Sequence, residues 1–179
     1  LRDNEIKLHS DIAENWILHF LDTGIKTQTG GRIKNAFDFI GNERVFATYG
    51  DALADINISK LLDFHKSHGK LATVSIVRPP SRFGKISLQD NKVVKFEEKP
   101  QLGEGWINGG FFVLEPEVKD YIKSFDQQFE TFPMEQLAKD GQLMAFKHEG
   151  FWHPCDVIRD KINLENYWNE KKAPWKLWN

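Results

Sequence analysis

The chain has 179 residues, of which 40% are hydrophobic and 13% aromatic, and its net charge is −2. This composition suits one domain with a sizeable core, and the near-neutral charge excludes a broad basic surface for nucleic acid or anionic membrane. No apolar run approaches transmembrane length. Cys155 is the only cysteine, so no disulfide can form within the chain, and we expect a cytoplasmic protein.

The first half of the chain predicts short strands and helices in alternation. Runs of β-type residues predict strands at Glu5–Leu8, Trp16–Leu21, Arg44–Tyr49 and Leu71–Val77, the third of them buried. The stretch TGIKTQTGGR, Thr23–Arg32, predicts a polar loop, and a short helix is expected at 33–39. Helically spaced apolar residues predict a helix at Ile58–His68 that ends at Gly69.

The second half continues this alternation after a hairpin. The hairpin is predicted from Gly84–Leu88 and Val93–Glu97, which QDNK joins. Further strands are expected at Phe111–Leu114 and Gln142–Lys147. Helices are expected at Pro116–Ser124, Met134–Lys139 and Asp156–Trp168.

These elements predict an α/β fold with a Rossmann-like, mixed but mostly parallel sheet flanked by helices. The strand–helix–strand unit at 44–77 implies parallel strands joined by a right-handed crossover. Ligands of such sheets bind at the carboxyl ends of the strands, which places Tyr49–Asp51 at a candidate ligand edge.

Two aspartates could bind a metal ion or serve the backbone. Asp51 follows a strand and Gly50, where a carboxylate could hold Mg²⁺ together with substrate phosphates or could close a turn. Asp55 is the better candidate for the cap of the next helix. Asp156, in FWHPCD, opens a predicted helix, so its local pattern favours an N-cap.

Three polar stretches allow both a functional and a structural interpretation. FEEKP at 96–100 combines acids with a lysine but equally suits the end of a surface hairpin. WINGGFF at 106–112 suits a backbone that meets a polar ligand, or a bulge. TGIKTQTGGR suits a nucleotide, or a flexible loop. The histidines show no metal-binding spacing, and His65 and His68 are expected to be solvated.

Taken in order, the motifs of this chain resemble the sugar-nucleotide pyrophosphorylase family, in particular the cytidylyl branch that acts on glucose 1-phosphate. The motifs are LDTGIKTQTGGR, TYGDALADI, EEKP, INGGFFVL, GFWHPCDVIRDK and KKAPWKLW. The resemblance implies a nucleotide-diphospho-sugar transferase fold. Residues 1–179 would form the C-terminal two-thirds of one domain that lacks its first strands, with a C-terminal helix and Trp-rich tail at 151–179.

The resemblance also implies a metal site and a nucleotide site. The aspartates of TYGD and FWHPCD, Asp51 and Asp156, would together hold Mg²⁺ as catalytic residues. Gly50 would lie beside the nucleotide. The TGGR loop would contact the nucleotide through Thr27 and Arg32.

For the sugar phosphate, the resemblance implies a second set of residues. Glu98 would bind sugar hydroxyls, and Lys99 would bind and align the attacking phosphate. Asn108 and Gly109 of INGG would lie near the sugar. The implied reaction is transfer of a cytidylyl group from CTP to α-D-glucose 1-phosphate, giving CDP-glucose and pyrophosphate. This product feeds the dideoxysugars of bacterial surface polysaccharides such as the O-antigen of lipopolysaccharide.

The chain departs from the family in one respect. The family's Gly-rich GGxGTRL loop and its KP lysine, which serve the triphosphate, have no counterpart in this sequence. We therefore expect the chain to be part of an enzyme and to be inactive alone. An inactive relative that binds sugar phosphate or serves assembly is the alternative, and a thymidylyl- or uridylyltransferase is the alternative enzyme. Family members assemble, so a homo-oligomer is expected.

Overall fold

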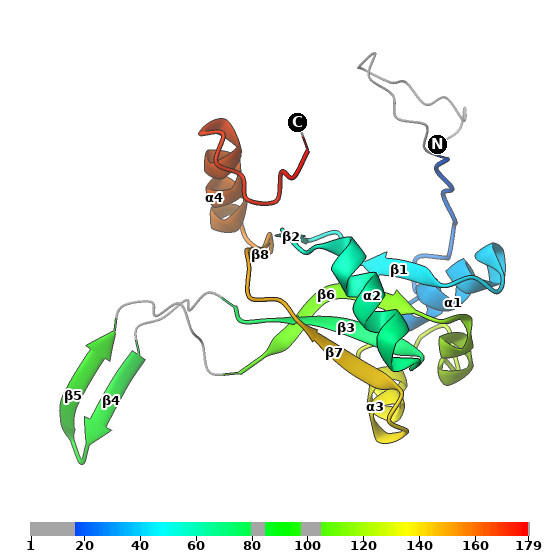
Figure 1. Cartoon of the computed structure of the whole chain (residues 1–179), viewed down its shortest axis with the longest axis horizontal. Coiled ribbons are helices and arrows are strands. Elements are labelled where there is room, and N and C mark those ends of the chain that lie inside the picture. The colour runs from blue at the N-terminus through cyan, green and yellow to red at the C-terminus, as the bar shows by residue number, and fades with distance from the viewer. Residues whose placement is uncertain (1–16, 80–84, 98–104, 179) are drawn as a thin grey trace.

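A computed structural model of the protein describes residues 17–79, 85–97 and 105–178. Its main sheet has four strands in the order β1-β6-β3-β7 (Figure 1). These strands are β1 (Val45–Thr48), β6 (Ile107–Leu114), β3 (Ala72–Val77) and β7 (Leu143–Lys147). The predicted strand at Glu5–Leu8 lies outside the described residues.

The α/β class is confirmed, but the expectation of a mostly parallel sheet is wrong for the described strands. β6 runs antiparallel to both β1 and β3, and only β3 and β7 pair in parallel. β1 and β3 do point in the same direction, as the strand–helix–strand pattern predicted. They do not touch, because β6 lies between them and Leu114 pairs with Val45 on one side and with Ala72 on the other.

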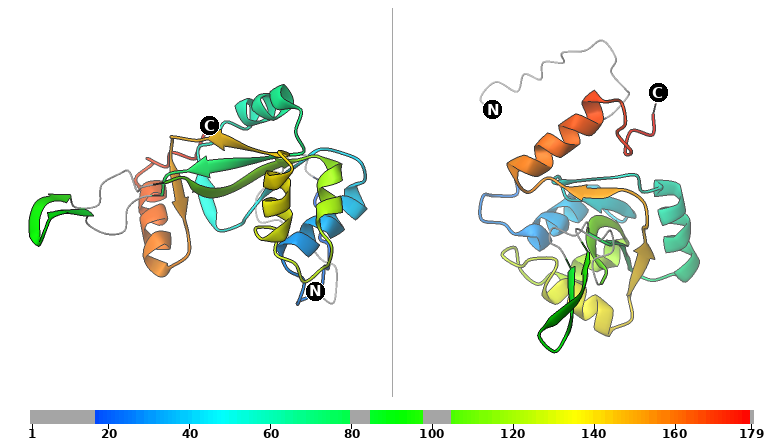
Figure 2. Two further views of the ribbon diagram at one scale, coloured as in Figure 1. Left: turned by 90° about the horizontal axis from the view of Figure 1, so that it is seen from below. Right: turned by 90° about the vertical axis from the view of Figure 1, so that its left-hand side faces the viewer.

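Helices cover both faces of this sheet (Figure 2). α2 (Ile58–His68) lies on one face, where its Leu61 packs in one cluster with Val113 of β6, and these side chains are 1% and 0% exposed. α1 (Thr29–Ile40), the 3-10 helix η1 (Pro116–Tyr121) and α3 (Phe132–Lys139) lie on the other face. Their core is built from large apolar side chains, including Phe37, Phe112, Phe129 and Leu137.

Two smaller sheets accompany the main one. The predicted hairpin is confirmed as β4 (Lys85–Gln89) and β5 (Lys92–Glu97). β2 (Ala52–Ala54) pairs with β8 (Trp152–Pro154), and the sequence did not predict either strand because three residues are too short to show a period.

The C-terminal segment packs as expected for an aromatic tail. α4 (Ile158–Asn169) is followed by a turn that returns Trp175 to the ring of Phe151, with ring centroids 5.4 Å apart. Tyr167 lies edge-on to both rings. Tilted and edge-on aromatic pairs of this kind stabilise the packing of the C-terminal segment.

Five local predictions need correction. Thr23–Arg32 is not all loop, because α1 begins at Thr29, and residues 17–21 form no strand. β1 is half-buried rather than buried, since it is an edge strand whose outward residue Phe46 is 47% exposed. The cap of α2 is Asn57, whose side chain accepts from the Lys60 N–H at 2.9 Å, and not Asp55. α4 begins after Val157, so Asp156 is not its N-cap.

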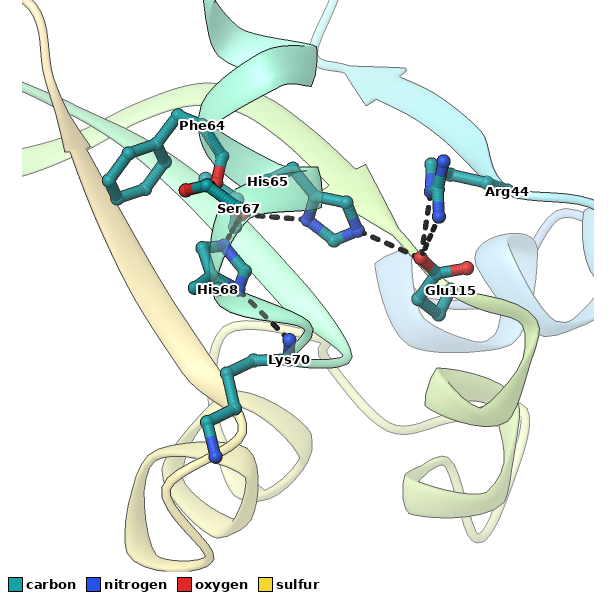
Figure 3. Close-up of polar contacts among 8 residues, drawn as sticks. Arg44, Phe64, His65, Ser67, His68, Lys70 and Glu115 are labelled. Atoms are coloured by element: carbon teal, nitrogen blue, oxygen red, sulfur yellow. Dashed lines mark hydrogen bonds and ion pairs between the residues drawn. The ribbon is translucent and has the colours of Figure 1, made fainter.

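His65 and His68 are also not solvated, which corrects a further expectation. His65 is 1% exposed, and its Nδ1 lies 2.8 Å from the buried hydroxyl of Thr73. His68 Nε2 reaches the same hydroxyl at 2.8 Å (Figure 3). His65 Nε2 lies 3.0 Å from Glu115, which also forms an ion pair with Arg44.

The hydrogen-bond partners of the two histidines determine which ring nitrogen carries the proton. His68 Nδ1 accepts from the Lys70 N–H at 2.9 Å, so Nε2 carries the ring proton and donates to Thr73. The Thr73 hydroxyl then donates to His65 Nδ1, and His65 Nε2–H donates to Glu115. His68 is therefore held neutral, because a proton added at Nδ1 would face the Lys70 N–H donor.

This cluster predicts a loss of stability in acid. Burial, reinforced by the neighbouring His65 and Lys70, lowers the pKa of His68, so the unfolded chain binds more protons near pH 6.5. Burial would raise the pKa of Glu115, but hydrogen bonds from Arg44 and His65 outweigh it and lower that pKa, which adds a second loss at lower pH. We expect the melting temperature to fall by a few degrees, on the order of 3 °C, as the pH falls through the pKa of a free histidine.

Thermal unfolding followed by circular dichroism across this pH range measures the effect. His68→Asn should flatten the dependence, because the amide can accept from Lys70 but does not titrate. His19→Asn, at an exposed histidine, is the matched control and should keep it. A wild-type melting temperature that stays constant down to the titration range of carboxylates would contradict the assignment.

Candidate active site

The end of β1 leads directly into the short β2–β8 ladder. Gly50 forms a bend after Tyr49, and the Asp51 carbonyl accepts from the Cys155 N–H at 2.7 Å. The ladder continues with Ala52 opposite Pro154. Asp51 and Asp156 are therefore brought to the same end of one ladder, although a large part of the chain separates them in sequence.

This arrangement suits a hard divalent cation for which the protein supplies only some of the ligands. Asp51 and Asp156 are both exposed. The described residues contain no group of three or more His, Cys, Asp or Glu side chains placed to hold a metal ion. Mg²⁺ takes one or two carboxylates and completes its shell with water and substrate phosphates, so two carboxylates at an open ladder end fit it.

Tyr49 connects this ladder to the sheet. Its ring packs edge-on against Phe112 at 5.5 Å, and its hydroxyl donates to Glu130. The Asn108 side chain lies beside the phenol and lowers its pKa, against the effect of burial. Burial raises the pKa of Tyr49 well above its usual range. The hydrogen bond to Glu130 and the charges of Glu130 and Asp51 raise it further, so the phenol stays protonated.

Asn108 is positioned by a bulge in β6. Between the pairs Val74–Phe112 and Ile76–Asn108 the two strands lose register, so Gly109 and Gly110 fall in the irregular stretch. The structural interpretation of INGG as a bulge is thus confirmed. Asn108 Oδ1 accepts from the Gly110 N–H at 2.8 Å, which turns the amide nitrogen toward Tyr49.

The two glycines of the bulge are needed for packing. Gly109 is buried, and a Cβ there would lie 2.9 Å from the Ser75 carbonyl oxygen. Its own carbonyl accepts from the Trp152 indole at 2.9 Å. Gly110 has a φ of +78°, and a Cβ there would lie 2.8 Å from the Tyr49 ring. The predicted role of Gly109 near a sugar stays a prediction.

The start of α1 holds the predicted nucleotide contacts. The Arg32 guanidinium donates to the Thr23 hydroxyl and to the Gly24 carbonyl, and so closes the turn that precedes the helix. Thr27 donates its hydroxyl to the Thr23 carbonyl. Both side chains therefore shape this turn, and their roles toward a nucleotide stay predictions.

A small cavity of about 160 Å³ lies between the start of α1 and the end of β1. Its lining includes Thr29, Arg32, Thr48, Tyr49 and Phe112. The cavity thus joins TGGR to TYGD, two motifs that the sequence places apart.

The sequence did not identify two residues of the site, and two residues that it did predict lie outside the described part of the chain. Glu98 and Lys99 lie outside the described residues. Tyr49 and Glu130 were missed as site residues, although Tyr49 stands inside the TYGD motif. Glu130 belongs to no quoted motif, and only the fold brings it to the site.

Comparisons with known proteins agree on one family. The family model described as nucleotidyl transferase matches residues 11–169. A glucose-1-phosphate cytidylyltransferase of Salmonella typhi is 44% identical over 179 residues, which cover 99% of this chain and 70% of the relative. A mannose-1-phosphate guanyltransferase of Saccharomyces cerevisiae is 37% identical over 164 residues, covering 83% of this chain and 44% of that one.

A solved structure supports the fold. A UDP-glucose pyrophosphorylase crystallised with UDP-glucose superimposes with a TM-score of 0.61 at 17% identity, covering 83% of this chain and 64% of that chain. This chain therefore spans 70% of the length of the Salmonella typhi relative and 64% of that of the crystallised pyrophosphorylase. Among the described residues, no helix has the length and apolarity that a membrane crossing requires.

Proposed function

The chain belongs to the nucleotidyl transferase family, and from this premise we propose that it serves an enzyme that transfers a cytidylyl group from CTP to α-D-glucose 1-phosphate. The products would be CDP-glucose and pyrophosphate. The observation that carries the proposal is the 44% identity to the Salmonella typhi cytidylyltransferase over the whole chain. The pairing of TYGD with the FWHPCD segment in one ladder supports it.

The reaction needs no covalent enzyme intermediate. A phosphate oxygen of glucose 1-phosphate attacks the α-phosphorus of CTP, a new P–O bond forms, and the bond to pyrophosphate breaks. The residues have to bring the two substrates together in line and offset the charge of their phosphates. Lys99 would align the attacking phosphate, and Asn108 would hold the sugar, with Glu98 on its hydroxyls.

Asp51 and Asp156 are the residues that would hold Mg²⁺. When bound, the ion would neutralise negative charge on the phosphates as it develops. The exposed carboxylates leave space for a nucleotide, and Gly50 beside them carries no side chain to obstruct it. A Cβ at Gly50 would meet no other heavy atom of the described residues within 4 Å.

Release of pyrophosphate tests the proposal directly. The assay contains Mg²⁺, glucose 1-phosphate and one of CTP, dTTP, UTP or GTP. It is run on this chain and on a fusion in which the chain is preceded by the part of the Salmonella typhi relative that it does not span. We expect turnover by the fusion with CTP at least about tenfold above that with any other nucleotide, and little turnover by the chain alone.

Each other outcome has a definite meaning. Preference for dTTP or UTP would replace the cytidylyl assignment with a thymidylyl or uridylyl one. No turnover by a folded fusion, together with binding of glucose 1-phosphate, would favour the inactive sugar-phosphate-binding relative. Robust turnover by the chain alone would show that the triphosphate needs no further segment.

A further inference from the structure

We propose that Glu130 is a positioning residue that holds the nucleotide side and the sugar side of the site in one arrangement. This inference rests on the proposed function for what the site binds. The geometry that supports it is independent of that function. Glu130 lies in the loop just before α3, outside every motif that carries the resemblance.

The Glu130 carboxylate joins two elements directly. One oxygen accepts from the Thr29 hydroxyl at 2.7 Å, and the other accepts from the Tyr49 hydroxyl. Thr29 is the first residue of α1, and Tyr49 directly follows β1. Thr29 is itself anchored, because its hydroxyl oxygen accepts from the Phe129 N–H at 2.9 Å. The start of α1 and the end of β1 are thus tied to one carboxylate.

Tyr49 extends this connection to a third element. Its hydroxyl proton is committed to Glu130, which can only accept, so the phenol oxygen is left to accept from Asn108. The other end of the Asn108 amide is held by the Gly110 N–H at 2.8 Å. Donor and acceptor roles are therefore assigned from Asn108 through Tyr49 to Glu130, and the amide has one orientation.

The three connected elements carry the predicted substrate contacts. α1 begins just after Thr27 and contains Arg32, β1 is followed by Gly50 and Asp51, and the bulge carries Asn108. The backbone of Tyr49 is fixed too, because its N–H donates to the Gly110 carbonyl at 3.1 Å. Loss of the carboxylate would release the phenol and with it the Asn108 amide, and would change the surroundings of the Gly50–Asp51 bend that follows Tyr49.

Two variants remove the connection with little change in volume. Tyr49→Phe keeps the ring on Phe112 and removes the hydroxyl, and Glu130→Gln replaces one acceptor with a donor. Two matched controls alter similar groups elsewhere on the protein. Tyr121→Phe removes a hydroxyl that donates to Asp140 at 3.1 Å, and Glu135→Gln changes an exposed residue of α3.

The first measurement needs no ligand. In ¹H–¹⁵N spectra of the 179-residue chain, Tyr49→Phe and Glu130→Gln should each shift the Asn108 side-chain amide and the backbone amides of Gly50 and Asp51. Tyr121→Phe and Glu135→Gln should leave these signals in place. Unchanged Asn108 and Asp51 signals in both site variants would overturn the proposal, whatever the chain binds.

The second measurement is calorimetric titration of the same chain with CDP-glucose and Mg²⁺. Each single site variant should weaken binding about tenfold, and the double variant should weaken it no further, because both remove one connection. Additive losses, or unchanged affinity at a lowered melting temperature, would overturn the positioning role. Shifted amide signals in both site variants, together with a wild-type chain that binds no CDP-glucose, would instead count against the proposed function and leave the connection standing.

Discussion

Replacing Asp51 by asparagine is expected to reduce Mg²⁺-dependent cytidylyl transfer by at least about 100-fold, the equivalent of about 3 kcal/mol in the barrier. The substitution keeps the size of the side chain and removes its charge, and Mg²⁺ relies on few protein carboxylates. The backbone should be unaffected, because the Asp51 carbonyl keeps its bond to the Cys155 N–H. Asp156→Asn should have an effect of similar size.

The measurement is pyrophosphate release by the fusion described above, as a function of Mg²⁺ concentration. Raising Mg²⁺ should recover part of the activity of each variant, since a weakened site can still be filled by mass action. Asp63→Asn, on the exposed side of α2, is the matched control and should behave as the wild type. An Asp51→Asn fusion with unchanged activity and unchanged Mg²⁺ dependence would disprove the metal assignment.

Replacing Gly31 by alanine is expected to destabilise the chain by about 3 kcal/mol, the upper part of the usual range for overpacking. Gly31 is buried, and a Cβ there would lie 2.7 Å from the Phe125 Cα and would also collide with the Phe125 carbonyl. These are backbone atoms and cannot rotate away. Helix α1 would have to move, which would stretch the bond from the Gly30 N–H to the Gln127 carbonyl, now 3.0 Å.

Urea unfolding of the two alanine variants Gly31→Ala and Gly50→Ala measures the contrast. Gly50→Ala should change the free energy of unfolding by less than about 0.5 kcal/mol, because a Cβ there meets nothing within 4 Å in the described structure. Equal stabilities would show that the glycines of TGGR do not pack against residues 125–127. That result would return TGGR to its interpretation as a flexible ligand loop.

The elements that the sequence predicted well are those with a local signal. The helix at Ile58–His68 has apolar residues at helical spacing and ends at Gly69, whose φ of +63° suits glycine, and it was found with its bounds unchanged. The hairpin at 85–97 and the strand β3 were found for similar reasons. The short strands β2 and β8 carry no such signal and were missed.

The residues of the candidate site also differ in whether a local sequence pattern identifies them. Asp51, Asp156, Asn108 and Arg32 stand in quoted motifs, so the sequence could name them without any structure. Glu130 stands in none, and its importance appears only when the hydrogen bonds to Thr29 and Tyr49 are seen. His65 is a similar case, since its buried partners Thr73 and Glu115 come from other elements.

The sequence by itself therefore determined the α/β class, most of the helices and strands, the family and the residues that belong to its motifs. The tertiary structure decided the order and direction of the strands, the bulge that turns Asn108, and the meeting of Asp51 with the Cys155–Asp156 segment. The physical reason is that propensity, period and capping act over a few neighbouring residues. Strand pairing and shared carboxylates join residues far apart in the chain, where no short pattern records the partner.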